Sequence, residues 1–263
     1  MMSWLRVPSR RFIVISWKNN PSGLIANSCS PVSNTTICIH QPDFAPYLGF
    51  FQRLLMSQHF ILLDDVQFIR RGWQHRDRIK GRNGPVWLTL ALRKGDYHQL
   101  INEVELSNDP NWIADNLNLL RECYGKARHF AEVFPRVEAI YHAGHCRMID
   151  FNCALLDMAM EYFDISKSIS RASEYDINAT SSARLLALVQ ARQGDTYLTG
   201  MGSRDYLDEG MFQTAGVQVM WKNFRHPVYP QLYGDFEPML SCLDVLFNCG
   251  RDAASVLRST LND

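Results

Sequence analysis

Polar side chains follow four segments that have the composition of β-strands, at residues 37–39, 60–63, 197–199 and 217–221. In an open α/β sheet, ligands bind outside the carboxyl ends of the strands. If these four strands are parallel neighbours, their polar clusters share one rim and line one cleft. The clusters are His40 and Gln41; Asp64, Asp65 and Gln67; Gly200, Gly202 and Ser203; and Asn223, Arg225 and His226.

Asp64 and Asp65 are the first candidates for a general base, which acyl transfer to an amine or a hydroxyl requires. Successive side chains of a strand point to opposite faces, so one of the two should face the cleft and the other should cap or pair with an arginine. We expect Asp65 to be catalytic because it lies nearer the carboxyl end of its strand. His226 competes for this role, although a histidine that precedes Pro227 is also typical of a structural residue.

Neutral hydrogen-bond donors for a tetrahedral oxyanion are available at two of the clusters. The amide of Gln41 is one, and the turn that contains Gly200, Gly202 and Ser203 is the other. A Gly-x-Gly sequence is also typical of a tight turn without a ligand.

Residues 70–80 carry five fixed positive charges together with Trp73. Within them, Arg76 and Arg78 share one side if the segment is extended. Guanidinium groups bind phosphate or carboxylate in a bidentate manner, and an adjacent aromatic ring can stack on a sugar or base. We therefore predict a loop that binds an anionic small molecule, such as a nucleotide-sugar or an activated acyl donor. The alternative is a solvated loop.

The elements that must position these residues alternate between strands and helices. Helices are predicted near 47–57, from Asp109-Pro110 to Gly125, and near 133–141, 149–163 and 179–193, with a further strand at 86–92. This order predicts an α/β fold, a mainly parallel sheet covered by helices with a Rossmann-like core. A nucleotidyltransferase-like version of that core is an alternative.

The sequence His142-Ala143-Gly144-His145 matches the His-x-Gly-His pattern of nucleotidyltransferases, but it follows a predicted helix instead of the first strand. At the expected strand-to-helix position stands Tyr47-Leu48-Gly49-Phe50, with aromatic residues in place of the two histidines. We interpret this as a related fold that lacks the nucleotidyl-transfer residues. His142, His145 and Cys146 without distant partners are weak evidence for zinc, so no metal site is predicted, and the sequence leaves the cofactor open.

Composition excludes several classes of protein. The 263 residues carry 27 basic and 27 acidic side chains, and residues 1–36 hold four of the basic ones and no acid. The remaining chain, predicted to form a single domain at 37–263, is therefore acidic, which argues against nucleic acid as the main ligand. Residues 1–36 are predicted to be a poorly ordered extension. No apolar run is long enough for membrane insertion, and the seven cysteines without Cys-x-x-Cys predict free thiols in a reducing cytoplasm.

Several motifs together resemble the WbqC-like protein family. They are Ile39-His40-Gln41-Pro42, Pro46-Tyr47-Leu48-Gly49-Phe50-Phe51, Leu63-Asp64-Asp65-Val66-Gln67-Phe68, Arg76 with Arg78-Ile79, Tyr197-Leu198 with Gly200, Tyr206-Leu207, Tyr229 with Gln231, and the segment from Leu243 to Asn248. The resemblance adds Tyr47, Tyr229 and Gln231 to the expected substrate-binding residues. Members commonly read Asn-Arg-Asn-Arg-Ile where this chain has His75-Arg76-Asp77-Arg78-Ile79, so the roles of positions 75 and 77 are open.

The resemblance implies a pathway, because this family is known from bacterial O-antigen and other surface-polysaccharide gene clusters and a glycine transferase role has been suggested for it. We expect a cytoplasmic transferase that attaches an aminoacyl (glycyl) or acyl group to a sugar. Arg76 and Arg78 would hold the anionic group of the donor. The alternative is a non-catalytic protein that binds a nucleotide-sugar or an enzyme of the same pathway.

Overall fold

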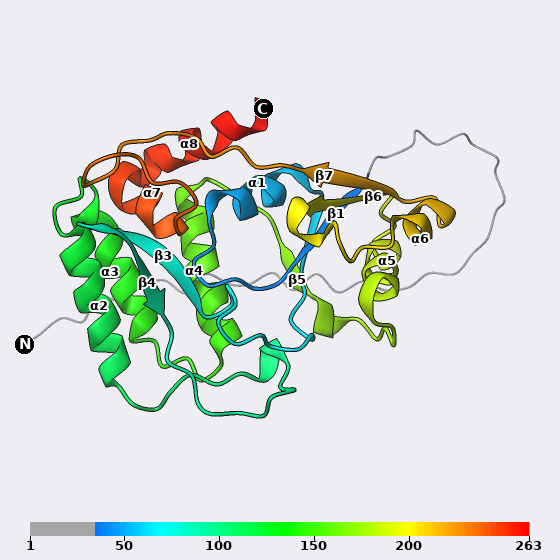
Figure 1. Ribbon diagram of the computed structural model, residues 1–263, viewed down its shortest axis with the longest axis horizontal. Coiled ribbons are helices and arrows are strands. Elements are labelled where there is room, and N and C mark those ends of the chain that lie inside the picture. Colours follow the sequence, from blue (N-terminus) through cyan, green and yellow to red (C-terminus); the bar gives the residue numbers. More distant parts are fainter. Residues whose placement is uncertain (1–34, 263) are drawn as a thin grey trace, which may run out of the picture. The chain divides into compact units, whose positions relative to one another are not determined.

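The computed structural model describes residues 35–262, which are built around a five-stranded parallel sheet with the strand order β5-β2-β1-β6-β7 (Figure 1). The strands are β1 (Thr36–His40), β2 (His59–Leu62), β5 (Ile169–Arg171), β6 (Thr196–Gly200) and β7 (Gln218–Lys222). Each neighbouring pair runs parallel. The predicted α/β fold with a Rossmann-like core is confirmed, and the four strands that precede the polar clusters are neighbours.

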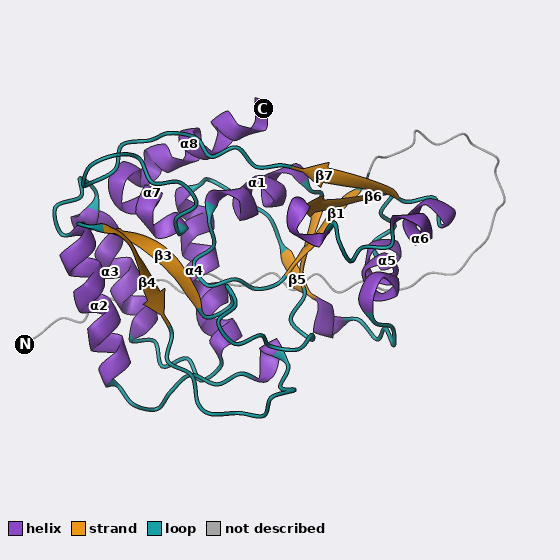
Figure 2. Cartoon of the chain, viewed as in Figure 1, coloured by secondary structure: helices purple, strands orange, loops and turns teal. Residues whose placement is uncertain are grey.

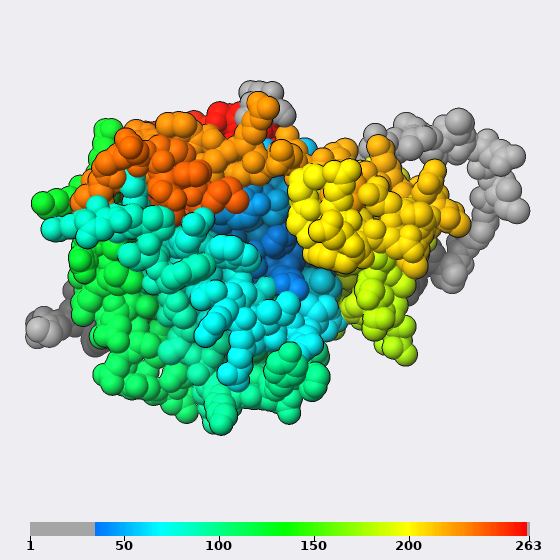
Figure 3. Space-filling view, in the orientation of Figure 1, coloured from blue at the N-terminus to red at the C-terminus, as the bar shows by residue number. Residues whose placement is uncertain are grey.

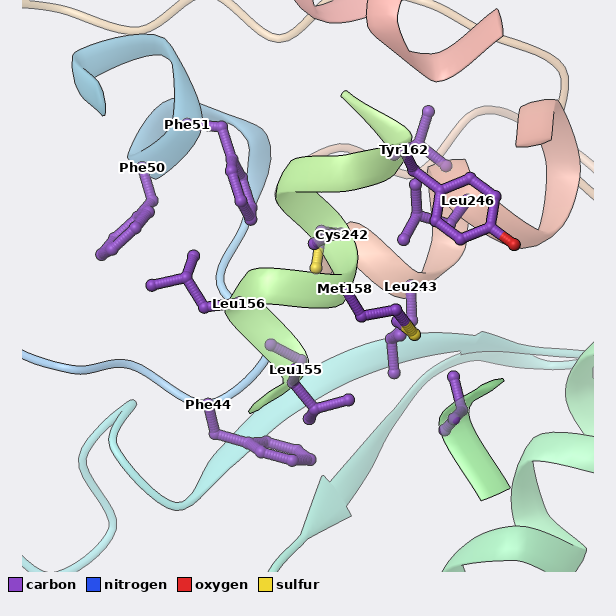
Figure 4. Packing of buried hydrophobic residues seen from close by; sticks show 14 of the residues in the cluster. Phe44, Phe50, Phe51, Leu155, Leu156, Met158, Tyr162, Cys242, Leu243 and Leu246 are labelled. Atoms are coloured by element: carbon purple, nitrogen blue, oxygen red, sulfur yellow. The ribbon is translucent and has the colours of Figure 1, made fainter. Parts of the chain in front are cut away.

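Helices cover both faces of this sheet. They are α1 (Leu48–Met56) and α4 (Met148–Tyr162) on one face, and α5 (Ser181–Ala191) and α6 (Glu209–Thr214) on the other. Because side chains alternate along β1, Cys38 enters the core with α1 and α4, whereas Ile37 and Ile39 enter the core with α5 and α6. Figure 4 shows the first core, where α4 packs between Phe50 and Phe51 of α1 and the helix α7 (Cys242–Cys249), which precedes the last helix α8 (Ala253–Ser259).

The order of the strands reverses at β1. The chain proceeds from β1 outward through β2 to β5, and it then returns to β6 on the other side of β1 and continues to β7. The carboxyl ends of β1 and β6 therefore send their following segments to opposite faces of the sheet, which opens a crevice between them. His40 and Gly200 are the last residues of these two strands.

A long insertion separates β2 from β5. It contains the antiparallel hairpin of β3 (Arg76–Gly81) and β4 (Gly84–Thr89), followed by α2 (Asn111–Tyr124) and α3 (Phe130–Tyr141) (Figure 2). The strand predicted at 86–92 is thus β4, which is outside the main sheet and starts earlier. The predicted loop at 70–80 was wrong from Arg76 onward, because the buried side chains of Asp77 and Ile79 alternate with half-exposed arginines in β3.

A buried polar network joins this hairpin to the C-terminal part of the chain. The carboxylate of Asp244 on α7 accepts hydrogen bonds from the hydroxyls of Tyr124 and Tyr229, at 2.8 and 2.9 Å. The backbone N–H of Lys80 on β3 donates to the same Tyr124 hydroxyl at 2.9 Å, and the Lys80 ammonium donates to Gln231 Oε1 at 3.0 Å. Tyr229 and Gln231, expected at the substrate, thus make contacts that hold the fold together.

Other expectations have the following outcomes. The helix predicted after Asp109 is α2, and Asp109 Oδ1 accepts from the N–H of Asn111 at 3.0 Å. All six cysteines in residues 35–262 are free thiols, and Cys146 is exposed. No helix of the described residues is long and apolar enough to cross a membrane, and they contain no group of three metal-ligating side chains. The extension predicted at 1–36 lies outside the described residues, except that Thr36 already belongs to β1.

The Asp244 network predicts a large loss of stability on its removal. Asp244→Ala leaves the buried hydroxyls of Tyr124 and Tyr229 without their acceptor, so we expect the free energy of unfolding to fall by about 3 kcal/mol. Urea denaturation measures this change. Asp252→Ala, on an exposed side chain eight residues later, is the control and should change stability by less than about 0.5 kcal/mol. Equal effects of the two substitutions would contradict the role of the network.

Candidate functional site

The segment that leaves β1 forms the floor of a depression in the molecular surface. Figure 3 shows this segment in blue, bordered by the cyan residues of the β2–β3 region, the yellow residues after β6 and the orange residues after β7. This depression lies at the reversal of strand order, and the segments that follow β1, β6 and β7 border it. Three titratable side chains come from this segment and from α1, namely His40, Asp43 and Arg53.

His40 and Asp43 form a close pair with unusual protonation. His40 Nδ1 lies 3.6 Å from Asp43 Oδ2 and donates to the carbonyl of Gln41 at 2.9 Å. Burial and the charge of Arg53 lower the pKa of His40 to about 3. Burial raises the pKa of Asp43 from 3.8 to about 7, against the opposing effect of Arg53. At neutral pH a neutral imidazole therefore stands beside a carboxyl group that is half ionised.

Their side chains are still reachable from solvent, with exposed fractions of 27% for His40 and 10% for Asp43. A general base works best when its pKa lies near the working pH, because it is then both available and basic. Asp43 meets this condition at pH 7, whereas a pKa of about 3 makes His40 a poor base. The arrangement can remove a proton from a substrate at Asp43.

Arg53 lies beneath the same crevice. It extends from α1, only 3% of the residue is exposed, and its Nη1 donates to the hydroxyl of Tyr47 at 3.2 Å. The guanidinium also lies close to Gly200 at the end of β6. The ring of Tyr47 meets the edge of Phe224 with centroids 5.5 Å apart, so the segment after β7 closes over this part of the site.

Asp77 is a second buried carboxyl group with a raised pKa. Only 4% of the residue is exposed, and Oδ1 accepts from the N–H of Arg78 at 2.6 Å. Burial raises its pKa to about 8; the hydrogen bond from Arg78 opposes this shift and the charge of Asp43 adds to it. Asp77 is therefore mostly protonated at neutral pH.

Part of the arginine segment forms an exposed platform with two tryptophan rings. The Arg76 guanidinium stacks over the Trp87 ring at 4.2 Å, and the Trp73 and Trp87 rings are 5.7 Å apart. About half of each tryptophan is exposed, 49% for Trp73 and 44% for Trp87. Arg76 also donates to the Arg71 carbonyl at 2.7 Å, and Arg78 donates to the Met239 carbonyl at 3.3 Å. We call Trp73, Arg76 and Trp87 the aromatic platform.

The two aspartates proposed as the base are held by other partners. Asp64 is fully buried and accepts from the N–H and hydroxyl of Ser173, at 2.9 and 2.7 Å. Asp65 forms an ion pair with Arg184 of α5. The arginine pairing that we expected for the non-catalytic aspartate therefore belongs to Asp65. Both carboxylates fix the region beyond β5, and a catalytic role for Asp65 stays a prediction.

The remaining predicted residues lie in several environments. His226 Nδ1 donates to the Pro227 carbonyl at 3.0 Å, and the imidazole ring packs on Phe224. The Nε2 atom of His226 is buried without a partner, and burial lowers the pKa of this histidine. The Gln41 Oε1 accepts from the amide of Gln74. Gln67 donates to the Tyr97 carbonyl at 3.0 Å, outside the crevice.

The glycine turn after β6 is a short 3-10 helix, Met201–Ser203. The Ser203 hydroxyl bonds to Thr199 Oγ1 at 2.8 Å and to the Gly200 carbonyl at 3.2 Å, while Gly202 is exposed. The His-x-Gly-His sequence lies between α3 and α4, where the His145 ring packs on Phe151. Its position supports our interpretation that the match is coincidental.

Sequence reasoning missed Asp43, Arg53, Asp77 and Trp87. Asp43 follows a proline in an apparent turn, and an arginine on an amphipathic helix normally lies at the surface. Trp87 was assigned to the main sheet. One signal was available, because Asp43 is the first acidic residue of the chain and stands three residues after His40.

Comparisons with known proteins identify one family. Residues 41–256 match the model of the WbqC-like protein family. A relative, the uncharacterized protein Rv1507c of Mycobacterium tuberculosis (strain ATCC 25618 / H37Rv), is 33% identical over 225 residues, which cover 84% of this chain and 97% of the relative. No solved structure matches the chain at a significant level.

The raised pKa of Asp77 predicts a pH-dependent effect of Asp77→Asn. The folded protein keeps a proton on Asp77 that the unfolded chain releases above about pH 4, so this group lowers stability progressively until pH reaches about 8. Asparagine cannot ionise and removes this loss. Urea denaturation should find Asp77→Asn more stable than the wild type by a few kcal/mol at pH 8 and nearly equal to it at pH 4. The exposed Asp205→Asn is the control. A difference that is the same at both pH values contradicts the assignment.

Proposed function

This chain belongs to the WbqC-like protein family, and we propose that it is a transferase of surface-polysaccharide biosynthesis that attaches an aminoacyl group, glycyl above all, or another acyl group to a sugar. Its reaction would take place in the crevice between the carboxyl ends of β1 and β6. The free thiols of the described cysteines support the cytoplasm as its compartment.

The observation that carries this proposal is the Asp43 carboxyl group beside His40 at the end of β1. Attack of a sugar amine or hydroxyl on an acyl donor requires removal of a proton. Asp43 has a pKa of about 7 and a partly exposed side chain, so it can accept this proton at neutral pH. His40 stays neutral and donates to a backbone carbonyl, and it thereby supports the turn that carries Asp43.

The attack produces a tetrahedral oxyanion, which needs hydrogen-bond donors. Because Gln74 donates to Gln41 Oε1, the amide nitrogen of Gln41 is oriented as the remaining donor. The first N–H groups of the 3-10 turn Met201–Ser203 have no partner within that turn and supply a second set of donors. These are the roles that the sequence suggested for Gln41 and for the glycine turn.

The aromatic platform would bind the flat part of a substrate. Two half-exposed tryptophan rings and a stacked guanidinium fit a sugar ring or a nucleotide base. The same exposed platform favours the alternative function, a non-catalytic protein that binds a nucleotide-sugar. The two functions differ in whether loss of one carboxylate abolishes turnover while binding persists.

Asp43→Asn tests the proposal. Nucleotide-sugars and glycyl or other acyl donors are incubated with the protein, and mass spectrometry detects a transferred group. The substitution keeps the shape of the side chain and removes its basicity, so turnover should fall roughly 100-fold or more with substrate binding retained. In the wild type, kcat/KM should rise with pH through about 7, because the base acts when deprotonated, and this rise should disappear in the variant.

Asp65→Asn is the matched comparison. It weakens the ion pair with Arg184 and should lower the melting temperature with turnover less affected. If Asp65→Asn abolishes turnover and Asp43→Asn does not, the base is Asp65. If no tested donor is transferred by the wild type although a nucleotide-sugar binds, the non-catalytic function is favoured.

A further inference from the structure

Arg53 is a buried cation that lacks a carboxylate partner. Only 3% of the residue is exposed, and no carboxylate among residues 35–262 lies within ion-pair distance of its guanidinium. Its polar neighbours are the hydroxyl of Tyr47 and the thiol of Cys38, whose pKa is raised by burial, and its Nε is buried without any partner. Buried charges in proteins are normally paired because removing them from water is costly.

The position of this cation coincides with the crevice. Arg53 Nη1 would lie 3.3 Å from a Cβ atom added to Gly200, and Cζ would lie 3.7 Å from it. Gly200 has an ordinary φ of −88°, so its backbone does not require glycine. The missing side chain instead keeps the end of β6, directly before the turn Met201–Ser203, from pressing a methyl group against the guanidinium.

We propose that Arg53 is the centre of a phosphate-binding subsite at the junction of β1 and β6. A guanidinium presents parallel N–H donors that match two oxygens of a phosphate group. The Tyr47 hydroxyl, which accepts from Arg53 Nη1, can donate its own proton to the same anion, and the anion neutralises the buried charge. This inference rests on the proposed function for the identity of the ligand, which is the phosphate group of an activated donor.

This subsite lies at Arg53, whereas the sequence led us to expect that Arg76 and Arg78 hold the anionic group of the donor. Those two arginines already donate to the carbonyls of Arg71 and Met239. Arg53 has a free buried nitrogen and a glycine beside it. The phosphate would therefore lie on the same crevice as Asp43, with the aromatic platform further along the hairpin.

Two glycines of one turn provide a matched test. Gly200→Ala places a methyl group against the Arg53 guanidinium, whereas Gly202→Ala meets no atom within 4 Å. Isothermal titration calorimetry of the full chain with inorganic pyrophosphate should give binding to the wild type and to Gly202→Ala, and at least fivefold weaker binding to Gly200→Ala. Arg53→Lys keeps the charge without the planar fork and should weaken binding by at least tenfold. Melting curves establish that each variant is folded.

Further arms identify the source of the phosphate. Tighter binding of a uridine diphosphate sugar than of adenosine monophosphate, with loss of both in Gly200→Ala, assigns the subsite to a nucleotide-sugar; the reverse order assigns it to an adenylate donor. The proposal is overturned if pyrophosphate and both nucleotides fail to bind the wild type, or if Gly200→Ala binds them as tightly as Gly202→Ala. If Arg53→Lys does not fold, the glycine pair still decides. Asp43→Asn should bind pyrophosphate as tightly as the wild type. The phosphate subsite can therefore be confirmed even if the transferase function is wrong.

Discussion

Desolvation at the carboxyl end of β1 is the constraint on which the site depends. β1 is the central strand, flanked by β2 and β6 and covered by helices on both faces, so the chain that leaves it enters a region with little water. Ionised carboxylates and imidazoliums are disfavoured there. The same burial therefore holds His40 neutral, brings the pKa of Asp43 near 7 and leaves Arg53 as the fixed charge.

The insertion between β2 and β5 and the C-terminal segment support the walls of that crevice. The chain returns from β7 past Phe224 and His226 to α7, where Asp244 gathers the hydroxyls of Tyr124 and Tyr229. Through these contacts the hairpin with the aromatic platform is held beside the sheet. A buried network of this kind has few alternative arrangements because every unpaired member would cost free energy. Tyr229, which was expected at the substrate, therefore has a structural role.

More of the fold than of the candidate site could be predicted from the sequence. Short apolar runs followed by polar clusters identified β1, β2 and β6, because burial on both faces leaves a continuous hydrophobic signal. β7 was also identified by such a run, although it is a half-exposed edge strand. The ion pair of Asp65 was not predicted, since its partner Arg184 is 119 residues away and no local pattern reports such a pair. Asp43 is the opposite case. Its chemistry comes from what surrounds it in space, and its position three residues after His40 was the one local signal of it.

A carboxyl carbon-13 NMR titration of the aspartates, with Asp43→Asn used to assign its resonance, tests the central claim most directly. It needs no substrate and reports the protonation of one side chain. The account predicts that the resonance missing from the variant titrates with a midpoint near pH 7. A midpoint near pH 4, the ordinary range of an exposed aspartate, would contradict it and would remove the base from the crevice.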